Sequence, residues 1–276
     1  NTFLDRINLK TSKYLRTESM KFLVNRLVNT KLAVFFRNTL KIKPVYFNNF
    51  ENLKNSSISD SFCWRTDSGY VTKFKFSDIL NLFFESENSW VEVIFFDKAN
   101  NFLKKIQIKN LNISNEIIID KKFLNGVEDY GTFYIYHFCE KPNSLLNETI
   151  INRCYTGFSK DKQFYSFVHG NTLSKYKKNN DRDNELTNLV GTSYLKNHYY
   201  RIQKKFSGHD KNELIFANPT NTKIKFSIDE SKYVLEGGCS KKINFVDKNI
   251  SIRTNCLWLR PLVFSYKKDF FDVHHS

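Results

Sequence analysis

Four residues in the second half of the chain have side chains that could bind a metal ion. His169 follows an apolar stretch and precedes a glycine, which lets the backbone turn sharply. His274 and His275 lie close to the end of the chain, shortly after Asp272. Imidazole and carboxylate groups are common ligands of zinc and similar ions. If the last strand passes beside the strand that ends at His169, His169 and Asp272 with either His274 or His275 are predicted to form a mixed nitrogen and oxygen site.

A simpler interpretation of the same histidines stays open. Neighbouring residues in an extended strand point to opposite faces, so His274 and His275 would not normally bind one ion together. In this alternative the tail histidines are solvated and His169 hydrogen-bonds the backbone of its turn. The sequence has no H-E-x-x-H motif and no glycine-rich phosphate loop. We therefore expect no cofactor, with a divalent metal as the alternative, and the sequence does not decide whether the protein is an enzyme.

Aromatic residues next to arginines form a second candidate group. Binding sites combine apolar walls with a few polar groups, and a glycan or a protein could pack against exposed aromatic rings. Single-stranded nucleic acid uses a similar combination. The alternative is that the rings belong to the core, because aromatic residues are common in strands. The predicted ligand-binding residues are Trp64, Arg65, Asp67, Arg153, Tyr155, Tyr199, Tyr200 and Arg201.

The net charge of +15 is weak support for nucleic-acid binding. Only 10 of the 43 basic residues are Arg, whose planar fork suits phosphate. Lys, Asn, Phe and Ile are abundant and have AT-rich codons, so an AT-rich genome could produce the same balance. We expect a solvated lysine-rich surface, with nucleic acid as an unlikely partner on bulk composition.

Basic residues are concentrated at the start of the chain. Residues 1–50 contain ten basic residues and two acidic ones. Apolar residues at helical spacing predict an amphipathic helix over residues 19–38, ended before Pro44. Residues 1–43 could contact an anionic membrane or a partner, or the helix could pack on the rest of the protein. No apolar run reaches the roughly 18–20 residues of a membrane span, so no transmembrane segment is predicted.

The five cysteines predict a reducing environment. They are widely spaced, odd in number and without a C-x-x-C pair, which argues against a disulfide framework or a zinc ribbon. Buried thiols in a cytoplasmic protein are the simplest interpretation. The cysteines are Cys63, Cys139, Cys154, Cys239 and Cys256.

Short alternating stretches separated by turn residues predict a mainly β protein, with strands that include residues 70–76 and 131–138. Ser77 and Asp78 are expected to cap a helical turn, and the polar residues 48–61 are expected to form a linker or a loop. Residues 90–109 and 213–228 both have the pattern of a strand, a polar turn and a second strand, and we interpret them as equivalent hairpins of an internal repeat. The predicted fold is two tandem immunoglobulin-like β-sandwich units after an N-terminal helix. The predicted divisions are a basic segment and linker at 1–58, a first unit at 59–142 and a second at 143–276.

Our first hypothesis is a β-sandwich binding protein that recognises a glycan or a protein through aromatic and Arg residues. The first alternative is a metal-dependent enzyme with the His and Asp site in the second unit. The second alternative is association with nucleic acid or an anionic membrane through the basic N-terminal helix.

Overall fold

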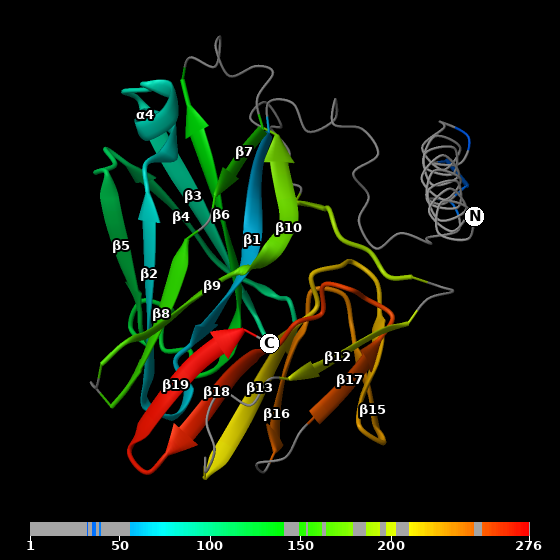
Figure 1. Ribbon diagram of the computed structural model, residues 1–276. Helices are drawn as coiled ribbons and strands as arrows, with labels where there is room; N and C mark the ends of the chain where they lie inside the picture. The colour runs from blue at the N-terminus through cyan, green and yellow to red at the C-terminus, as the bar shows by residue number, and fades with distance from the viewer. Residues whose placement is uncertain are drawn as a thin grey trace, which may run out of the picture. The chain divides into compact units, whose positions relative to one another are not determined.

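A computed structural model describes most of the chain after residue 55 (Figure 1). The chain divides into two compact units, Asn1–Lys43 and Pro44–Ser276. The described residues are 56–140, 149–152, 154–161, 164–178, 186–193, 197–202, 210–245 and 250–275, with Leu32, Phe35, Phe36 and Thr39 in the first unit.

Those four residues are all that is described of the first unit. They have helical conformation, and Phe35 and Phe36 are exposed. The rest of the predicted helix at 19–38, and with it the membrane or partner contact proposed for residues 1–43, lies outside the described residues. Among the described residues, no helix has the length and apolar character needed to cross a membrane.

The described part of the second unit is mainly β, and its strand pairs are antiparallel except for β1 with β7. Its elements are β1 (Ser56–Arg65), η1 (Asp67–Gly69), β2 (Tyr70–Ser77), α4 (Ile79–Phe84), β3 (Ser89–Asp97), β4 (Phe102–Lys109), β5 (Ser114–Ile119), β6 (Tyr130–Cys139), β7 (Thr149–Asn152), β8 (Tyr155–Lys160), β9 (Ser166–His169), β10 (Asn171–Lys178), β11 (Thr187–Asn188), β12 (His198–Ile202), β13 (Lys211–Ala217), β14 (Ile224–Ile228), β15 (Ser231–Leu235), β16 (Ser240–Phe245), β17 (Ile250–Thr254), β18 (Leu262–Lys267) and β19 (Phe270–His275).

Two of the four sheets form a first sandwich-like pair of layers. One sheet has the order β11-β10-β1-β6-β3-β4, with β7 pairing beside β1, and the other has the order β5-β2-β8-β9. Alternate residues of β2 are buried, as expected of a strand with one face on a core. The core between the sheets is rich in phenylalanine and includes Phe62, Trp64, Phe74, Phe95 and Phe133.

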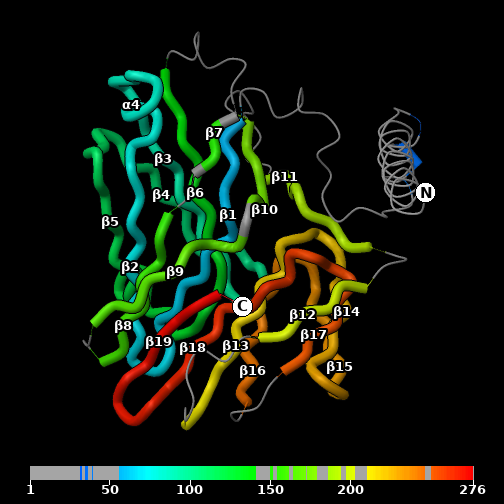
Figure 2. Tube along the Cα trace, viewed as in Figure 1, coloured from blue at the N-terminus to red at the C-terminus, as the bar shows by residue number. Residues whose placement is uncertain are grey.

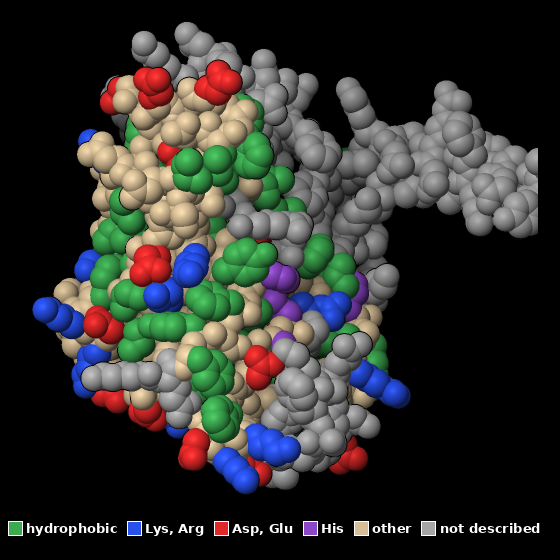
Figure 3. Space-filling model, turned by 60° about the vertical axis from the view of Figure 1, so that its left-hand side comes forward, with side chains coloured by type: hydrophobic (Ala, Val, Ile, Leu, Met, Phe, Trp, Pro, Cys, Tyr) green, Lys and Arg blue, Asp and Glu red, His purple; other side chains and the backbone are tan. Residues whose placement is uncertain are grey.

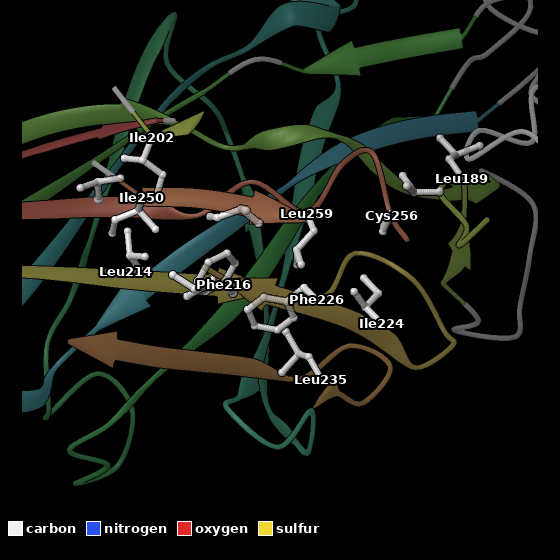
Figure 4. Close-up of a cluster of buried hydrophobic side chains, with 14 of the residues drawn as sticks. Leu189, Ile202, Leu214, Phe216, Ile224, Phe226, Leu235, Ile250, Cys256 and Leu259 are labelled. Atoms are coloured by element: carbon white, nitrogen blue, oxygen red, sulfur yellow. The ribbon is translucent and has the colours of Figure 1, made fainter. Parts of the chain in front are cut away.

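The other two sheets form a second pair of layers around a separate core. Their orders are β12-β17-β14-β15 and β16-β13-β18-β19. Figure 4 shows side chains from both sheets meeting between them, and the rings of Phe216 and Phe226 lie 4.7 Å apart. This core includes Leu214, Phe216, Ile224, Phe226 and Ile252.

The two pairs of layers share a third cluster of buried residues. It joins residues of β1, β2, β8 and β9 to residues of β13, β18 and β19. The edge strands β9 and β19 run beside each other (Figure 2), and the Ser166 hydroxyl donates to the Asp272 carboxylate at 2.7 Å. The cluster consists of Cys63, Tyr70, Phe158, Val168, Ile215, Leu262, Phe264, Phe271 and Val273.

Several local predictions are confirmed. The strands predicted at 70–76 and 131–138 are β2 and β6. The helical turn expected after Asp78 is α4, and the Asp78 side chain accepts a hydrogen bond from the Asn81 amide at 3.1 Å. The hairpin predicted at 90–109 is β3 paired with β4.

The second predicted hairpin is wrong. β13 pairs with β16 and β18, whereas β14 pairs with β15 and β17, so the turn between them carries the chain from one sheet to the other. Asn218 holds this crossing because its side-chain amide donates to the carbonyls of Thr222, Leu235 and Glu236. The stretches at 90–109 and 213–228 are therefore not structurally equivalent.

The division predicted between 142 and 143 does not separate the sheets. β8, which follows it, pairs with β2, and β10 pairs with β1. Long-range pairing of this kind leaves no mark in local sequence, whereas the polar residues near Pro142 resemble a linker.

Candidate binding face on the first sandwich

The outer face of the β5-β2-β8-β9 sheet carries aromatic and basic side chains in register. Lys75 of β2 pairs with Tyr155 of β8, which pairs with His169 of β9. Two residues further along each strand, Lys73 pairs with Gly157, which pairs with Phe167. Because alternate residues of a strand share one face, all of these positions lie on the side away from the Phe74 core.

Exposed rings continue beyond this sheet towards β19. The ring of Phe164 stacks on that of Phe270 with centres 6.0 Å apart, and the ring centres of Tyr165 and Phe167 are also 6.0 Å apart. Tyr155 is 54% exposed, Phe167 is 40% exposed and Phe270 is 63% exposed. Figure 3 views this side of the molecule, where hydrophobic and basic side chains are mixed and histidines gather beside them. We call Tyr155, Phe164, Phe167 and Phe270, with Lys73 and Lys75, the aromatic face.

Gly157 lets the ring of Phe167 lie close to the backbone at the centre of the aromatic face. A Cβ atom at Gly157 would lie 2.5 Å from the ring of Phe167, so this ring rests on the bare backbone of β8. Any larger residue at this position would push the ring away. Gly157 therefore fixes where Phe167 presents its outer side.

The lysines of this face are held by rings and by a carboxylate. The Lys75 ammonium lies 5.3 Å from the centre of the Phe167 ring, and the Lys73 ammonium lies 4.9 Å from that of Tyr165. Lys73 also forms an ion pair with Glu116 at 3.3 Å. The positive charges therefore border the rings and are partly compensated.

Two of the predicted metal ligands lie together at the edge of this face. The rings of His169 and His275 stack with centres 5.4 Å apart, and the His275 ring N–H donates to the His169 carbonyl. Burial lowers the pKa of His275, and the charges of His169 and His274 act in the same direction. Asp272 accepts its hydrogen bond from Ser166, while His274 is the next residue along β19 from His275 and so points to the opposite side.

Among the described residues, no group of three or more His, Cys, Asp or Glu side chains is arranged to hold a metal ion. The structure brings His169 and His275 together without completing the predicted set around them. The metal site stays a prediction.

The predicted residues at the end of β1 lie inside the protein. Trp64 is fully buried, and its indole N–H donates to the Phe96 carbonyl at 2.9 Å. Arg65 is also buried and makes two hydrogen bonds to Asp67, at 2.8 and 3.0 Å, and one to Glu213 at 2.8 Å. These side chains have structural partners and present no open surface to a ligand.

The Arg65 network joins the two pairs of layers. Glu213 lies on β13 of the second pair, and Lys242 of β16 donates to the Asp67 carboxylate at 2.6 Å. The guanidinium also lies 3.9 Å from the centre of the Tyr70 ring. Burial would raise the pKa of the Asp67 carboxyl, but Arg65 and then Lys242 hold it below its usual value.

The remaining predicted residues separate into different surroundings. Tyr199 and Arg201 are exposed on β12, whereas Tyr200 between them points inward and donates its hydroxyl to the Leu259 carbonyl. Burial raises the pKa of Tyr200, although the nearby Arg260 acts in the opposite direction. Arg153 lies outside the described residues. Of the seven predicted residues that the structure describes, Tyr155 is the one that lies on the aromatic face.

The sequence prediction missed Phe164, Phe167 and Phe270. The sequence contains a signal for Phe167 alone. Phe167 and His169 alternate with the apolar Val168, as the outward residues of a half-buried strand do. The contribution of Phe270 depends on β19 meeting β9, which local sequence does not show.

A cavity of about 780 Å³ lies apart from the aromatic face. It is lined by residues of the second pair of layers that include Leu214, Ile228, Tyr233 and Phe245. None of the predicted ligand-binding residues lines it. Comparison with known protein families and with curated proteins finds no match to this chain.

Proposed function

We propose that the protein is a binding module that docks a protein partner on the aromatic face. The observation that carries this proposal is the run of exposed rings over β8, β9 and the start of β19, which includes Tyr155, Phe167 and Phe270. Contiguous exposed aromatic groups are rare on surfaces that have no partner, and aromatic residues dominate the centres of protein interfaces.

The chemistry of the rings favours a protein over a glycan. Three of the four are Phe, which offers no group to hydrogen-bond a sugar hydroxyl. The lysines lie at the border of the rings, where they suit carboxylates of a partner more than a neutral sugar. The partner is therefore a protein whose apolar surface is bordered by acidic side chains, and a glycan is the competing outcome.

We also propose an immunoglobulin-like fold and a reducing, cytoplasmic location for the protein. An immunoglobulin-like assignment is supported by paired antiparallel sheets, although strands from both halves of the sequence share the first pair of layers. A reducing, cytoplasmic location is supported by five free thiols, of which four are buried. Burial raises the pKa of the Cys63 thiol to about 12, which keeps it unreactive.

Site-specific photo-crosslinking tests the proposal. A photo-crosslinking residue in place of Tyr155 should trap a discrete protein from the source cells. The matched control replaces Phe102, which is 61% exposed on β4, outside the aromatic face. The trapped protein, once purified, should bind the wild-type chain and should lose affinity for Phe167→Ala. Equal trapping from both positions would reject the aromatic face as the docking site, and binding to a glycan array that Tyr155→Ala abolishes would replace the protein with a glycan.

A further inference from the structure

The β12-β17-β14-β15 sheet buries one face and exposes the other. Its inward residues point towards β13 across the second core (Figure 4). Strand alternation therefore places the residues between them on the outer side. The inward residues are Ile202, Ile250, Ile252, Phe226 and Leu235.

The outward residues form a row across all four strands. Tyr199 of β12 pairs with Arg253 of β17, Arg253 pairs with Ser227 of β14, and Ser227 pairs with Lys232 of β15. With strands about 4.8 Å apart, the row is roughly 14 Å long. Arg201 and Lys225 are exposed on either side of it. We call Tyr199, Arg201, Lys225, Lys232 and Arg253 the basic face.

The cations of the basic face have no described ion-pair partner. No ion pair within the described residues includes Arg201, Lys225, Lys232 or Arg253. Some lysines of other sheets are paired, as Lys105 and Lys177 are with Glu92. The basic face is therefore a local concentration of uncompensated positive charge, which the net charge of the chain does not by itself imply.

An exposed ring accompanies this charge. Tyr199 is 69% exposed and lies directly across from Arg253. The ring of its inward neighbour Tyr200 is fixed under Arg260, at 4.3 Å, so β12 is anchored while Tyr199 stays open to solvent. Two of the chain's ten Arg residues, Arg201 and Arg253, belong to this face.

We propose that the basic face binds single-stranded nucleic acid. A base stacks on Tyr199, and Arg253, Arg201, Lys225 and Lys232 contact the phosphates along the row. Proteins that bind single strands without sequence preference combine aromatic rings, on which bases stack, with a row of basic side chains that contact the phosphate backbone. Arg can bind a phosphate through two parallel hydrogen bonds. The expectation drawn from bulk composition, that nucleic acid is an unlikely partner, concerns the total charge and not this arrangement. The proposal concerns a different surface from the aromatic face and does not rest on the function proposed for it.

Fluorescence anisotropy with a labelled homopolymeric single-stranded oligonucleotide tests this site in the full chain. Tyr199→Ala should weaken binding roughly tenfold without changing its dependence on salt. Arg253→Gln with Lys232→Gln should weaken binding and reduce the slope of log K against log salt by roughly 1.4, about 0.7 for each lost phosphate contact. The basic residues of the first 50 are the same in every variant, so they cannot produce the difference.

Lys109→Gln with Lys122→Gln is the matched control, because it removes the same charge from two exposed positions outside the β12-β17-β14-β15 sheet and outside the aromatic face. It should leave the affinity within about twofold, since such distant charges are largely screened. An equal loss in the control would overturn the proposal. A sulfated glycan that binds as tightly as the oligonucleotide, and is indifferent to Tyr199→Ala, would overturn it as well. Circular dichroism of each variant checks that the fold is kept.

Discussion

The aromatic face and the basic face both carry exposed positive charge, but in different surroundings. On the aromatic face Lys73 is paired with Glu116, and Lys75 lies over the ring of Phe167. On the basic face Arg253 and Lys232 have no described ion-pair partner, and the ring beside them belongs to Tyr199. The first face is an apolar surface with a charged border, whereas the second is a charged surface with one ring.

This difference shows why the total charge is a poor guide to partners. Charges that already have a partner contribute little to long-range attraction, whereas unpaired charges attract anions strongly and lose that attraction in salt. We therefore expect ligands of the aromatic face to depend weakly on salt, because apolar contacts dominate there, and ligands of the basic face to depend on it steeply.

The largest expected effect on stability comes from replacing Arg65, whose ion pairs link the two pairs of layers that carry these faces. Arg65→Met should lower the free energy of unfolding by about 3–5 kcal/mol, because it leaves Asp67 and Glu213 partly buried without their shared cation. Urea denaturation monitored by tryptophan fluorescence measures the change. Lys121→Met is the control, since it breaks the exposed pair with Glu128 and should cost less than about 1 kcal/mol. Equal losses in both variants would mean that the Arg65 network does not hold the two pairs together.

The next effect concerns the aromatic face alone. Phe167→Ala and Phe270→Ala should each weaken binding of the protein partner by at least about 2 kcal/mol, roughly thirtyfold, because central aromatic groups dominate interface energies. Isothermal titration calorimetry with the purified partner measures it. Phe102→Ala removes an equally exposed ring from β4 and should leave the affinity unchanged. If the three variants behaved alike, the exposed rings would have no special role.

The pH dependence of stability should show the effect of the buried His137 in the first pair of layers. Burial in the first pair of layers lowers the pKa of His137 to about 3. An unfolded histidine titrates near 6.5, so below about pH 6.5 the unfolded chain binds a proton that the native chain excludes, and stability falls by up to about 1.4 kcal/mol per pH unit.

His137→Gln should remove that part of the slope between about pH 6.5 and 5, which is above the range where the lowered carboxyl pKa values of Asp67 and Glu213 begin to matter. Because the pKa of His275 is also lowered, a smaller slope should remain. Denaturation curves at several pH values give both slopes. An unchanged slope in the variant would show that His137 is protonated in the native protein.

The smallest effect separates two neighbouring tyrosines of β12. Tyr200→Phe removes the hydrogen bond to the Leu259 carbonyl and should cost about 1 kcal/mol of stability with no change in oligonucleotide binding. Tyr199→Phe should change neither, since the ring remains. Thermal denaturation and anisotropy on the same samples measure the two properties. Loss of binding in Tyr200→Phe at constant stability would show that the wrong side of β12 had been assigned to the ligand.

Local pattern was sufficient for elements whose partners are near in sequence. The alternation in β2, the cap at Asp78 and the β3–β4 hairpin were all predicted because the residues that decide them are adjacent. The same reasoning failed at Asn218, whose side chain binds carbonyls as far away as Glu236 and turns an expected hairpin into a crossing between sheets.

The start of β1 shows a further limit. Its serines suggested a polar loop, yet all ten residues of this strand are buried. The Ser57 and Ser59 hydroxyls accept hydrogen bonds from the backbone amides of His137 and Ile135, both at 2.9 Å. Polar residues are tolerated in the interior here because distant backbone groups satisfy them, which composition alone cannot reveal.

The candidate sites were predicted in part for the same reason. Tyr155, Tyr199 and Arg201 were selected by residue type, and the structure leaves all three exposed. Trp64 and Arg65 are likewise an aromatic and a basic residue, but they are enclosed by segments from β3 and β13. Their burial therefore depends on long-range topology. Residue type identified candidates, whereas exposure depended on contacts that the sequence does not display.

Photo-crosslinking from position 155 at low salt and at about 1 M salt, where the screening length is about 3 Å, distinguishes apolar docking on the aromatic face from electrostatic attachment elsewhere. We expect one protein adduct that persists at high salt, survives Arg253→Gln with Lys232→Gln, and is absent when the crosslinker replaces Phe102. An adduct that disappears at high salt, or forms equally well from position 102, would contradict the assignment of the aromatic face as the docking site.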